Sequence, residues 1–119
     1  MTAIANNEKL TTIAKSASVI TLINIFTVEP ENQQRLVELL VKITEDVMIK
    51  LPGLISANIH KSVDGKQVAN YAQWMSVESV EDMRNSIKNN ERHQYLRAEV
   101  LKIATLNPVL YEVYYTNNL

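Results

Sequence analysis

The sequence predicts one α+β domain in which a four-stranded antiparallel sheet carries helices on one face. The first observation is the Asp64–Gly65 pair between two stretches of strand-like composition, which indicates a β-hairpin. The second is an apolar stripe with helical spacing, formed by Leu36, Leu39, Leu40, Ile43 and Val47. The third is the stretch 19–26, which is apolar at both alternating sets of positions and predicts a strand buried on both faces.

The helix that follows this first strand has recognisable ends. Pro30 suits the first turn of a helix, and the negative charge of Glu31 is favourable there. Pro52 and Gly53 end the helix.

The hairpin is predicted from two strands, residues 54–63 and 66–75. Asp64 and Gly65 are expected to form a two-residue turn in which both residues have positive φ. This turn fixes which residues of the two strands lie opposite each other.

Two more helical stretches and a strand complete the prediction. Ser76 is the expected N-cap of a helix whose inward residues are Val77, Val80, Met83 and Ile87. Asn90 is expected to cap a third helical stretch over residues 91–106. Pro108 then opens the last strand, residues 109–115.

The resulting order, βαββαβ, is the ferredoxin-like arrangement. We expect this domain to span residues 19–119, preceded by a tail of residues 1–18. The spacing of Leu10, Ile13, Ala14 and Ala17 in the tail fits a short helix as well as an irregular terminus.

The first strand also predicts a homodimer. A ferredoxin-like sheet has helices on one face, yet residues 19–26 are apolar on both faces. A second copy of the chain is the simplest cover for the other face. We therefore expect two sheets packed face to face as a dimeric α+β barrel.

Composition excludes several classes of function. The chain has 12 Lys and Arg against 13 Asp and Glu, which argues against nucleic acid or an acidic membrane surface as partner. It has no cysteine, and its two histidines are far apart in sequence, so we expect no metal site. No apolar run is long enough to span a bilayer, and residues 1–18 lack the features of a secretory signal. We expect a cytoplasmic protein.

The predicted hairpin register places a polar residue on an apolar face. Asn70 lies opposite Ile59 and shares its face with Trp74, which pairs with Ile55; this face is assigned to the helices. Between the large groups, Ala57 lies opposite Ala72. The two alanines leave room for a ligand, or they allow the helices to pack closer to the sheet.

The remaining polar candidates around such a cavity are Asn24, Arg97 and His93. Asn24 alternates with Leu22 and Phe26 on the first strand. A buried amide is unfavourable by a few kcal/mol unless it is hydrogen-bonded. Backbone groups, water or a ligand could satisfy Asn24.

The stretch PGLISANIHKSVDGKQVANYAQWMS resembles the central hairpin of the antibiotic biosynthesis monooxygenase (ABM) family. It is most similar to the small quinone-forming monooxygenases of aromatic polyketide pathways, and the same element order extends from about Val19 to Thr116. The resemblance implies a dimeric α+β barrel that oxidises an anthrone-type phenol to a quinone with O₂. It also implies that the enzyme needs no metal and no organic cofactor.

The resemblance further implies roles for individual residues. Asn70 and Trp74 correspond to the family's catalytic donors or ring contacts, and Arg97, in YLRAEVL, to its pocket arginine. His60 corresponds to a family histidine, but the predicted register places it on the opposite face. Val80 stands where the family has a tyrosine, so a hydroxyl that could carry a proton or anchor the substrate is missing.

Two alternative functions remain open. A second branch of the superfamily degrades haem with an Asn–Trp–His set, and Asn24 and His93 fall near the corresponding positions; Met83 stands where that branch has tryptophan. The chain could instead be a dimeric protein that binds a small molecule without turnover. Val80 and Met83 are therefore retained as substrate contacts, together with Asn24, His93 and Arg97.

Overall fold

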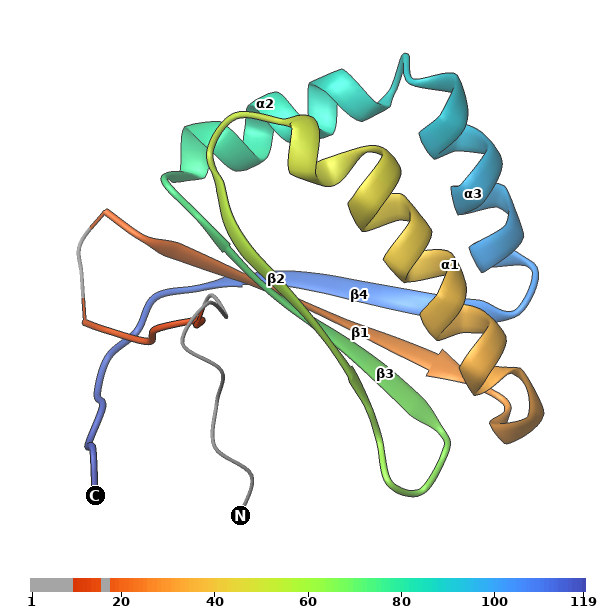
Figure 1. Ribbon diagram of the computed structural model, residues 1–119, viewed down its shortest axis with the longest axis horizontal. Helices are drawn as coiled ribbons and strands as arrows, with labels where there is room; N and C mark the ends of the chain where they lie inside the picture. Colours follow the sequence, from red (N-terminus) through yellow and green to blue (C-terminus); the bar gives the residue numbers. More distant parts are fainter. Residues whose placement is uncertain (1–9, 16–17) are drawn as a thin grey trace.

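The computed structural model describes residues 10–15 and 18–119. Its elements in chain order are β1 (Ile20–Val28), a 3₁₀ helix (Pro30–Asn32), α1 (Gln33–Asp46), a 3₁₀ turn (Met48–Lys50), β2 (Leu54–Lys61), β3 (Gln67–Trp74), α2 (Val77–Ile87), α3 (Glu91–Leu101) and β4 (Ala104–Tyr111). The four strands form one sheet in the order β2-β3-β1-β4, with antiparallel neighbours. The helices lie on one side of this sheet (Figure 1). The predicted ferredoxin-like α+β fold is confirmed.

Side-chain caps begin the second and third helices where the sequence predicts them. The Oγ of Ser76 accepts a hydrogen bond from the N–H of Ser79 at 3.1 Å. The Oδ1 of Asn90 accepts one from the N–H of His93 at 2.8 Å. Each cap satisfies a backbone donor that the helix itself leaves without a partner.

The end of the chain differs from the prediction. α3 ends at Leu101 instead of residue 106, and β4 begins at Ala104 and contains Pro108 instead of starting after it. Burial alternates from Ala104 onward, as in a strand with one face toward the core. Because β4 is an edge strand of the sheet, it tolerates a proline that lacks a backbone N–H.

The hairpin has the predicted register but a different turn. Asn70 pairs with Ile59, and Ala72 pairs with Ala57, as predicted. Residues 62–66 connect the two strands, and only glycines have positive φ among the described residues, so the predicted two-residue turn is wrong. The Oδ1 of Asp64 instead accepts a hydrogen bond from the N–H of Lys66 at 3.0 Å.

A bulge changes the pairing at the other end of the hairpin. The register shifts between Leu54 and Ser56, so Trp74 pairs with Leu54 and not with the predicted Ile55. Ile55 is consequently 49% exposed and lies outside the core. Next to the bulge, the N–H of Met75 donates a hydrogen bond to the carbonyl of Gly53 at 2.8 Å. This bond connects the start of β2 to the end of β3.

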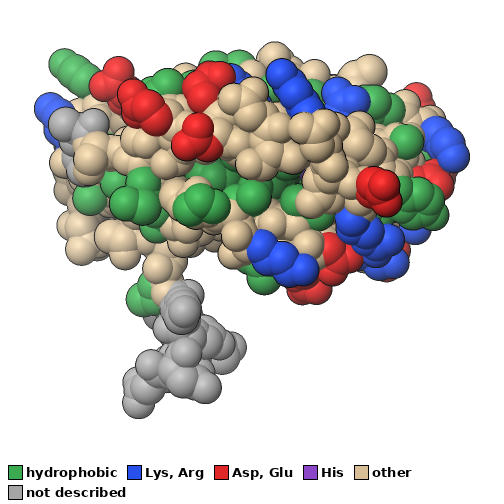
Figure 2. All heavy atoms as spheres, turned by 90° about the horizontal axis from the view of Figure 1, so that it is seen from above, with side chains coloured by type: hydrophobic (Ala, Val, Ile, Leu, Met, Phe, Trp, Pro, Cys, Tyr) green, Lys and Arg blue, Asp and Glu red, His purple; other side chains and the backbone are tan. Residues whose placement is uncertain are grey.

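The core between sheet and helices has two parts. The larger lies against α1 and α3 and includes Phe26, Leu36, Leu40, Leu96 and Val100. The smaller consists of Ala72, Trp74, Val80 and Met83, with half-buried neighbours. When the molecule in Figure 1 is viewed from above, hydrophobic side chains gather across the middle of its surface, and charged side chains of both signs surround them (Figure 2).

The described part of the tail lies against the sheet face that carries no helices (Figure 1). The Oγ1 of Thr11 donates to the Oδ1 of Asn58, and the Nε2 of Gln73 donates to the carbonyl of Thr12, both at 2.8 Å. Residues 10–15 are not helical, and Ala17 lies outside the described residues. Within the described residues, no helix has the length and apolar character needed to cross a membrane.

We predict that Gly53→Ala destabilises the protein more than Gly65→Ala. Both glycines have positive φ, 94° and 82°, so either substitution is unfavourable by about 1–2 kcal/mol. A Cβ at residue 53 would in addition overlap the side chain of Ser79, whereas at residue 65 the nearest atom is the Cβ of Pro30 at 3.4 Å. Urea unfolding of the two variants measures this difference. Equal losses would mean that the backbone relieves the overlap at residue 53.

Candidate active site

A cavity of about 310 Å³ lies between the helices and the sheet. Its volume is at the lower end of the range for small-molecule sites. Most of its wall is apolar and comes from both parts of the core, including Leu22, Phe26, Ile43, Met48, Ala72 and Met83. Ala57 and Ala72, which face each other across β2 and β3, both line it. Of the two interpretations of the alanines, the structure supports open space above the sheet.

Asn70 and Trp74 contribute polar groups to this wall. Both are on β3, on the face toward the helices, with Ala72 between them. Trp74 is 2% exposed, and its Nε1–H is buried without an acceptor. The Oδ1 of Asn70 is also buried, and the amide makes no hydrogen bond to the described residues. Each unsatisfied group is unfavourable by about 1–3 kcal/mol, and native proteins contain few of them.

Asn24 is partly satisfied by the backbone. On the sheet it lies directly opposite Asn70, and it also lines the cavity. Its Oδ1 accepts a hydrogen bond from the N–H of Asn107 on β4 at 3.1 Å. Its Nδ2 has no partner among the described residues and is a donor available to a ligand.

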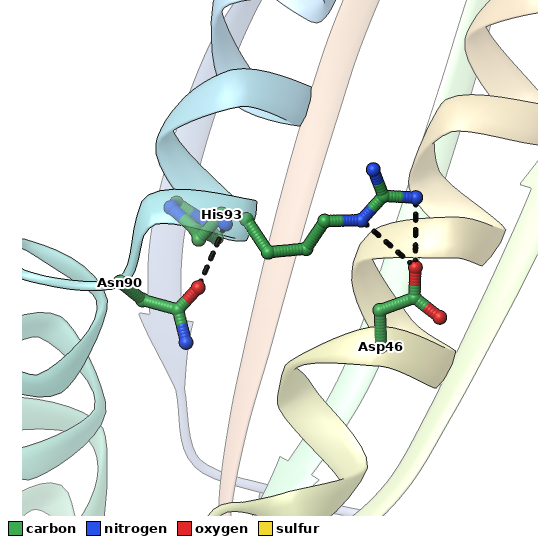
Figure 3. A network of polar contacts seen from close by, with 4 residues as sticks. Asp46, Asn90 and His93 are labelled. Atoms are coloured by element: carbon green, nitrogen blue, oxygen red, sulfur yellow. Dashed lines mark hydrogen bonds and ion pairs between the residues drawn. The ribbon is translucent and has the colours of Figure 1, made fainter.

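α3 brings His93 and Arg97 to the cavity from one helical turn apart. The Asn90 cap fixes the start of this helix beside His93 (Figure 3). His93 is 5% exposed, and its Nδ1 is buried without a partner. Burial lowers the pKa of His93, and the charge of Arg97 lowers that pKa further. His93 is therefore neutral at pH 7.

An ion pair connects α3 to α1. The Nε and one terminal nitrogen of Arg92 both lie 3.0 Å from the Oδ2 of Asp46 (Figure 3). Both side chains are nearly half exposed, so this pair adds little to stability. Its geometry nevertheless links the helix that carries His93 to the helix that forms another wall of the cavity.

The structure separates the other predicted residues. Met83 lines the cavity, whereas Val80 is fully buried and does not. His60 is exposed and pairs with Ala69, on the face away from the cavity, as the predicted register requires. Arg84 lines the cavity and was missed in the sequence. Its place three residues before Ile87, which also lines the cavity on α2, is the signal that could have indicated it.

Metal ligands do not cluster in the part of the chain that the structure describes. No group of three or more His, Cys, Asp or Glu residues there could hold a metal ion. The polar atoms of the cavity wall are amide, indole, imidazole and guanidinium nitrogens, with the oxygens of Thr44 and the two asparagines. The N–H groups among them can donate hydrogen bonds to oxygen atoms of organic molecules, and the amide oxygens can accept hydrogen bonds from hydroxyl groups.

We predict that His93 makes stability depend on pH below its ordinary pKa of 6.5. The unfolded chain protonates this histidine near pH 6.5, whereas the folded chain does so only at lower pH. Between these values the unfolded state binds more protons, so the free energy of unfolding decreases as the pH falls. Urea unfolding at several pH values should show this slope, and His93→Gln should reduce it. His60→Gln, which removes the exposed histidine, should keep it; loss of the slope in that variant would contradict the assignment.

Comparison with known proteins identifies the family. The model of the family described as "Antibiotic biosynthesis monooxygenase" matches residues 19–99. Tetracenomycin-F1 monooxygenase from Streptomyces glaucescens is 38% identical over 104 residues, which cover 87% of this chain and 89% of that protein.

Solved structures agree with this match. The ActVA-Orf6 monooxygenase of Streptomyces coelicolor, in complex with nanaomycin D, has a TM-score of 0.70 and 26% identity, covering 84% of this chain and 91% of that chain. SnoaB, a cofactor-independent oxygenase from Streptomyces nogalater, has a TM-score of 0.65, with 84% and 97% covered; at 16% identity it shows likeness of fold. The chain belongs to the antibiotic biosynthesis monooxygenase family and is an oxidoreductase of the monooxygenase type.

Proposed function

We propose that the cavity binds a flat phenolic substrate of the anthrone or quinol type, which the protein oxidises with O₂ to a quinone. The observation that carries this proposal is the pair of unsatisfied polar groups, Asn70 and Trp74, in an otherwise apolar cavity. An aromatic ring system fits the apolar wall. A hydroxyl group on it can donate to the Oδ1 of Asn70, and an oxygen on it can accept from the Nε1–H of Trp74.

The reaction needs no electron donor besides the substrate. In an anthrone, a CH₂ group lies between two aromatic rings, and a carbonyl group opposite acidifies its C–H bonds. Loss of one proton to solvent gives an enolate, which transfers an electron to O₂. Recombination forms a C–O bond, and the resulting peroxide takes up one proton. Loss of water from the peroxide gives the quinone, so CH₂ and O₂ become C=O and H₂O. All electrons come from the substrate, and the protein itself supplies binding and electrostatics.

The side chains have distinct roles in this scheme. The Nδ2 of Asn70 donates to the substrate oxygen on which negative charge develops, and the Nε1–H of Trp74 provides a second donor. Apolar residues exclude water from the reacting ring and so strengthen both hydrogen bonds. Neither donor carries a charge or changes its protonation state at neutral pH. The arrangement therefore favours the enolate without any change in the protein.

The relatives support this reading of the cavity. Tetracenomycin-F1 monooxygenase matches nearly nine tenths of this chain, and ActVA-Orf6 holds nanaomycin D. Val80 stands at the position where the family has a tyrosine. Its side chain is fully buried and does not line the cavity. The chain must therefore perform the reaction with the amide and indole donors and without a hydroxyl at that place.

We predict that Asn70→Ala slows oxygen uptake roughly 10²–10³-fold, the usual effect of removing one oxyanion donor, and changes substrate binding much less. An oxygen electrode with a metal-free sample and a panel of anthrones and hydroquinones measures this. Trp74→Phe keeps a ring but loses the indole N–H, so it separates ring contact from hydrogen bonding. If Asn70→Ala alters the melting temperature but leaves oxygen uptake per folded molecule unchanged, Asn70 is a structural residue.

The competing function is a binding protein without turnover. It predicts that phenolic ligands bind in the cavity and that no compound of the panel causes oxygen uptake. Binding without uptake in the unaltered protein would therefore contradict the proposed oxidation and leave the cavity as a ligand site.

We also propose that the protein is a homodimer whose sheets face each other. On the face without helices, residues 10–15 contact the side chains of Asn58 on β2 and Gln73 on β3. Over β1 and β4 the same face presents half-buried Ile23 and Ile25 and exposed Val109 and Tyr111, all apolar or aromatic. A second copy of this surface would remove these side chains from water.

We predict that Ile25→Asp dissociates or unfolds this dimer, because the carboxylate would be buried without a partner. Light scattering at micromolar concentration gives the mass in solution, and circular dichroism shows whether the variant is folded. Val41→Asp, on the exposed side of α1, is the matched control and should keep the mass of the unaltered protein. A monomeric mass for the unaltered protein would rule out the dimer.

A further inference from the structure

We propose that the arm formed by residues 10–15 and a second copy of the chain compete for the helix-free face of the sheet, so that the homodimer forms only when the arm leaves this face. This competition rests on the proposed homodimer and adds a step that controls it. Three features of the molecule support it: the path of the arm, the space between packed sheets and the weak contacts that hold the arm.

The arm crosses one end of the helix-free face from edge to edge. Its hydrogen bonds to the sheet lie at Asn58 on β2 and at Gln73 on β3. On the other side, the ammonium group of Lys15 lies 5.3 Å from the centre of the ring of Tyr114, which follows β4. Because the strand order is β2-β3-β1-β4, the arm passes over the whole width of the sheet.

Residues at this end of the face are buried although no helix covers them. Thr21 and Gln73 lie opposite each other on β1 and β3 and point away from the cavity. They are 3% and 4% exposed, whereas Ile23 and Ile25, on the same face of β1, are half-buried. The terminal segments therefore already occupy this end of the face in a single chain.

A second sheet needs the space that the arm fills. Two sheets packed face to face lie about 10 Å apart, and the side chains of both fill the space between them. A segment of backbone that lies flat on one sheet takes up much of this space, and in a two-fold dimer both arms would be present. The arm and the sheet of a second copy therefore exclude each other at this end of the face.

The contacts of the arm are weak enough for a second copy to displace it. All residues of the arm are exposed, and its Leu10 and Ile13 bury little apolar surface, being 66% and 52% exposed. The hydroxyl of Thr21 remains buried without a partner. Exposed hydrogen bonds and cation–π contacts contribute little to stability. A second copy would in return cover the apolar side chains of Ile23 and Ile25.

The arm can nevertheless compete because it is tethered to the sheet. Lys15 precedes the first residue of β1, Ile20, by only five positions. A short flexible linker gives an effective concentration in the millimolar range, far above a micromolar concentration of second copies. The fraction of dimer therefore depends on how firmly the arm is held.

A disulfide that fixes the arm tests the competition in the full chain. Thr11→Cys with Asn58→Cys places two thiols where the hydroxyl and the amide oxygen lie 2.8 Å apart, and the chain has no other cysteine. Light scattering over a dilution series should give a dissociation constant of the dimer about 10-fold higher or more for the oxidised than for the reduced protein, because a fixed arm cannot leave. Mass spectrometry under denaturing conditions shows that the disulfide lies within one chain. The unaltered protein, treated with the same oxidant, should keep its dissociation constant.

Weakening the contacts of the arm should have the opposite effect. Thr11→Val removes the hydroxyl that bonds to Asn58, and Lys15→Ala removes the contact with the ring of Tyr114. Together they should lower the dissociation constant about 3- to 30-fold, because each lost contact shifts the equilibrium of the arm by a few-fold and both protomers release an arm. Lys42→Ala, at an exposed position of α1, is the matched control and should leave the constant unchanged.

The outcomes separate the competition from the dimer itself. Tighter association of the Thr11→Val/Lys15→Ala protein supports the competition even if the disulfide does not form. An unchanged dissociation constant in this protein would reject the competition and leave the dimer. A higher constant would mean that the arm belongs to the interface and would also overturn the proposal, as would equal association of the oxidised and reduced disulfide variant. Monomers at every concentration, in the unaltered and the altered proteins alike, would reject the dimer and the competition with it.

Discussion

The register of β3 is the constraint on which the rest of the structure depends. β3 lies between β1 and β2, so its pairing fixes three strands at once. Because side chains alternate along a strand, Asn70, Ala72 and Trp74 all face the helices, while Tyr71 and Gln73 face the other way. A slip of one residue would exchange the donors of the cavity for the residues that contact the tail. The register of β3 therefore determines both the cavity and the surface on the opposite face of the sheet.

The cavity exists because large side chains surround small ones. Ala57 and Ala72 meet in the sheet, and the helices rest on the larger residues around them. The open space leaves the polar atoms of Asn70, Trp74 and His93 without partners, which is unfavourable for the empty protein. A well-packed apolar core would be more stable, but it would bind nothing. A ligand with hydroxyl and carbonyl groups in the right places recovers the missing hydrogen bonds, and that gain contributes to its affinity.

The sequence predicts this hairpin well because local and alternating signals agree there. The pair Asp64–Gly65 fixes the place of the turn, and the alternation of residues on both strands fixes the faces. The bulge next to Leu54 has no such signal, because neither glycine nor proline lies within it. The end of α3 was missed for another reason. Ile103 and Leu106 continue the helical spacing of Val100, and only the pairing of β4 with β1 decides in favour of a strand.

Arg84 shows a limit of patterns along one element. Helical spacing indicates that it lies near Val80, but not that the cavity extends to it, because the cavity also depends on where α3 lies. Val80 shows the reverse limit: similarity to the family indicates a position in the site, whereas the side chain is buried outside the cavity wall. To place either residue correctly, one has to know how the helices pack against the sheet.

The missing hydroxyl at Val80 changes how the chemistry of the wall is understood. The remaining polar groups are mainly donors and cations: the Nδ2 of Asn24, the amide of Asn70, the Nε1–H of Trp74 and two guanidiniums. Arginine does not release its proton in proteins, so His93 is the one described side chain of the wall that titrates near neutral pH. Its buried Nδ1 has no partner, and a proton there would be an unsatisfied donor, so the neutral ring favours its proton on Nε2. In that form His93 has a donor at Nε2 and a free acceptor at Nδ1. The donors and cations of the wall promote ionisation of a bound phenol or anthrone by lowering the free energy of the anion.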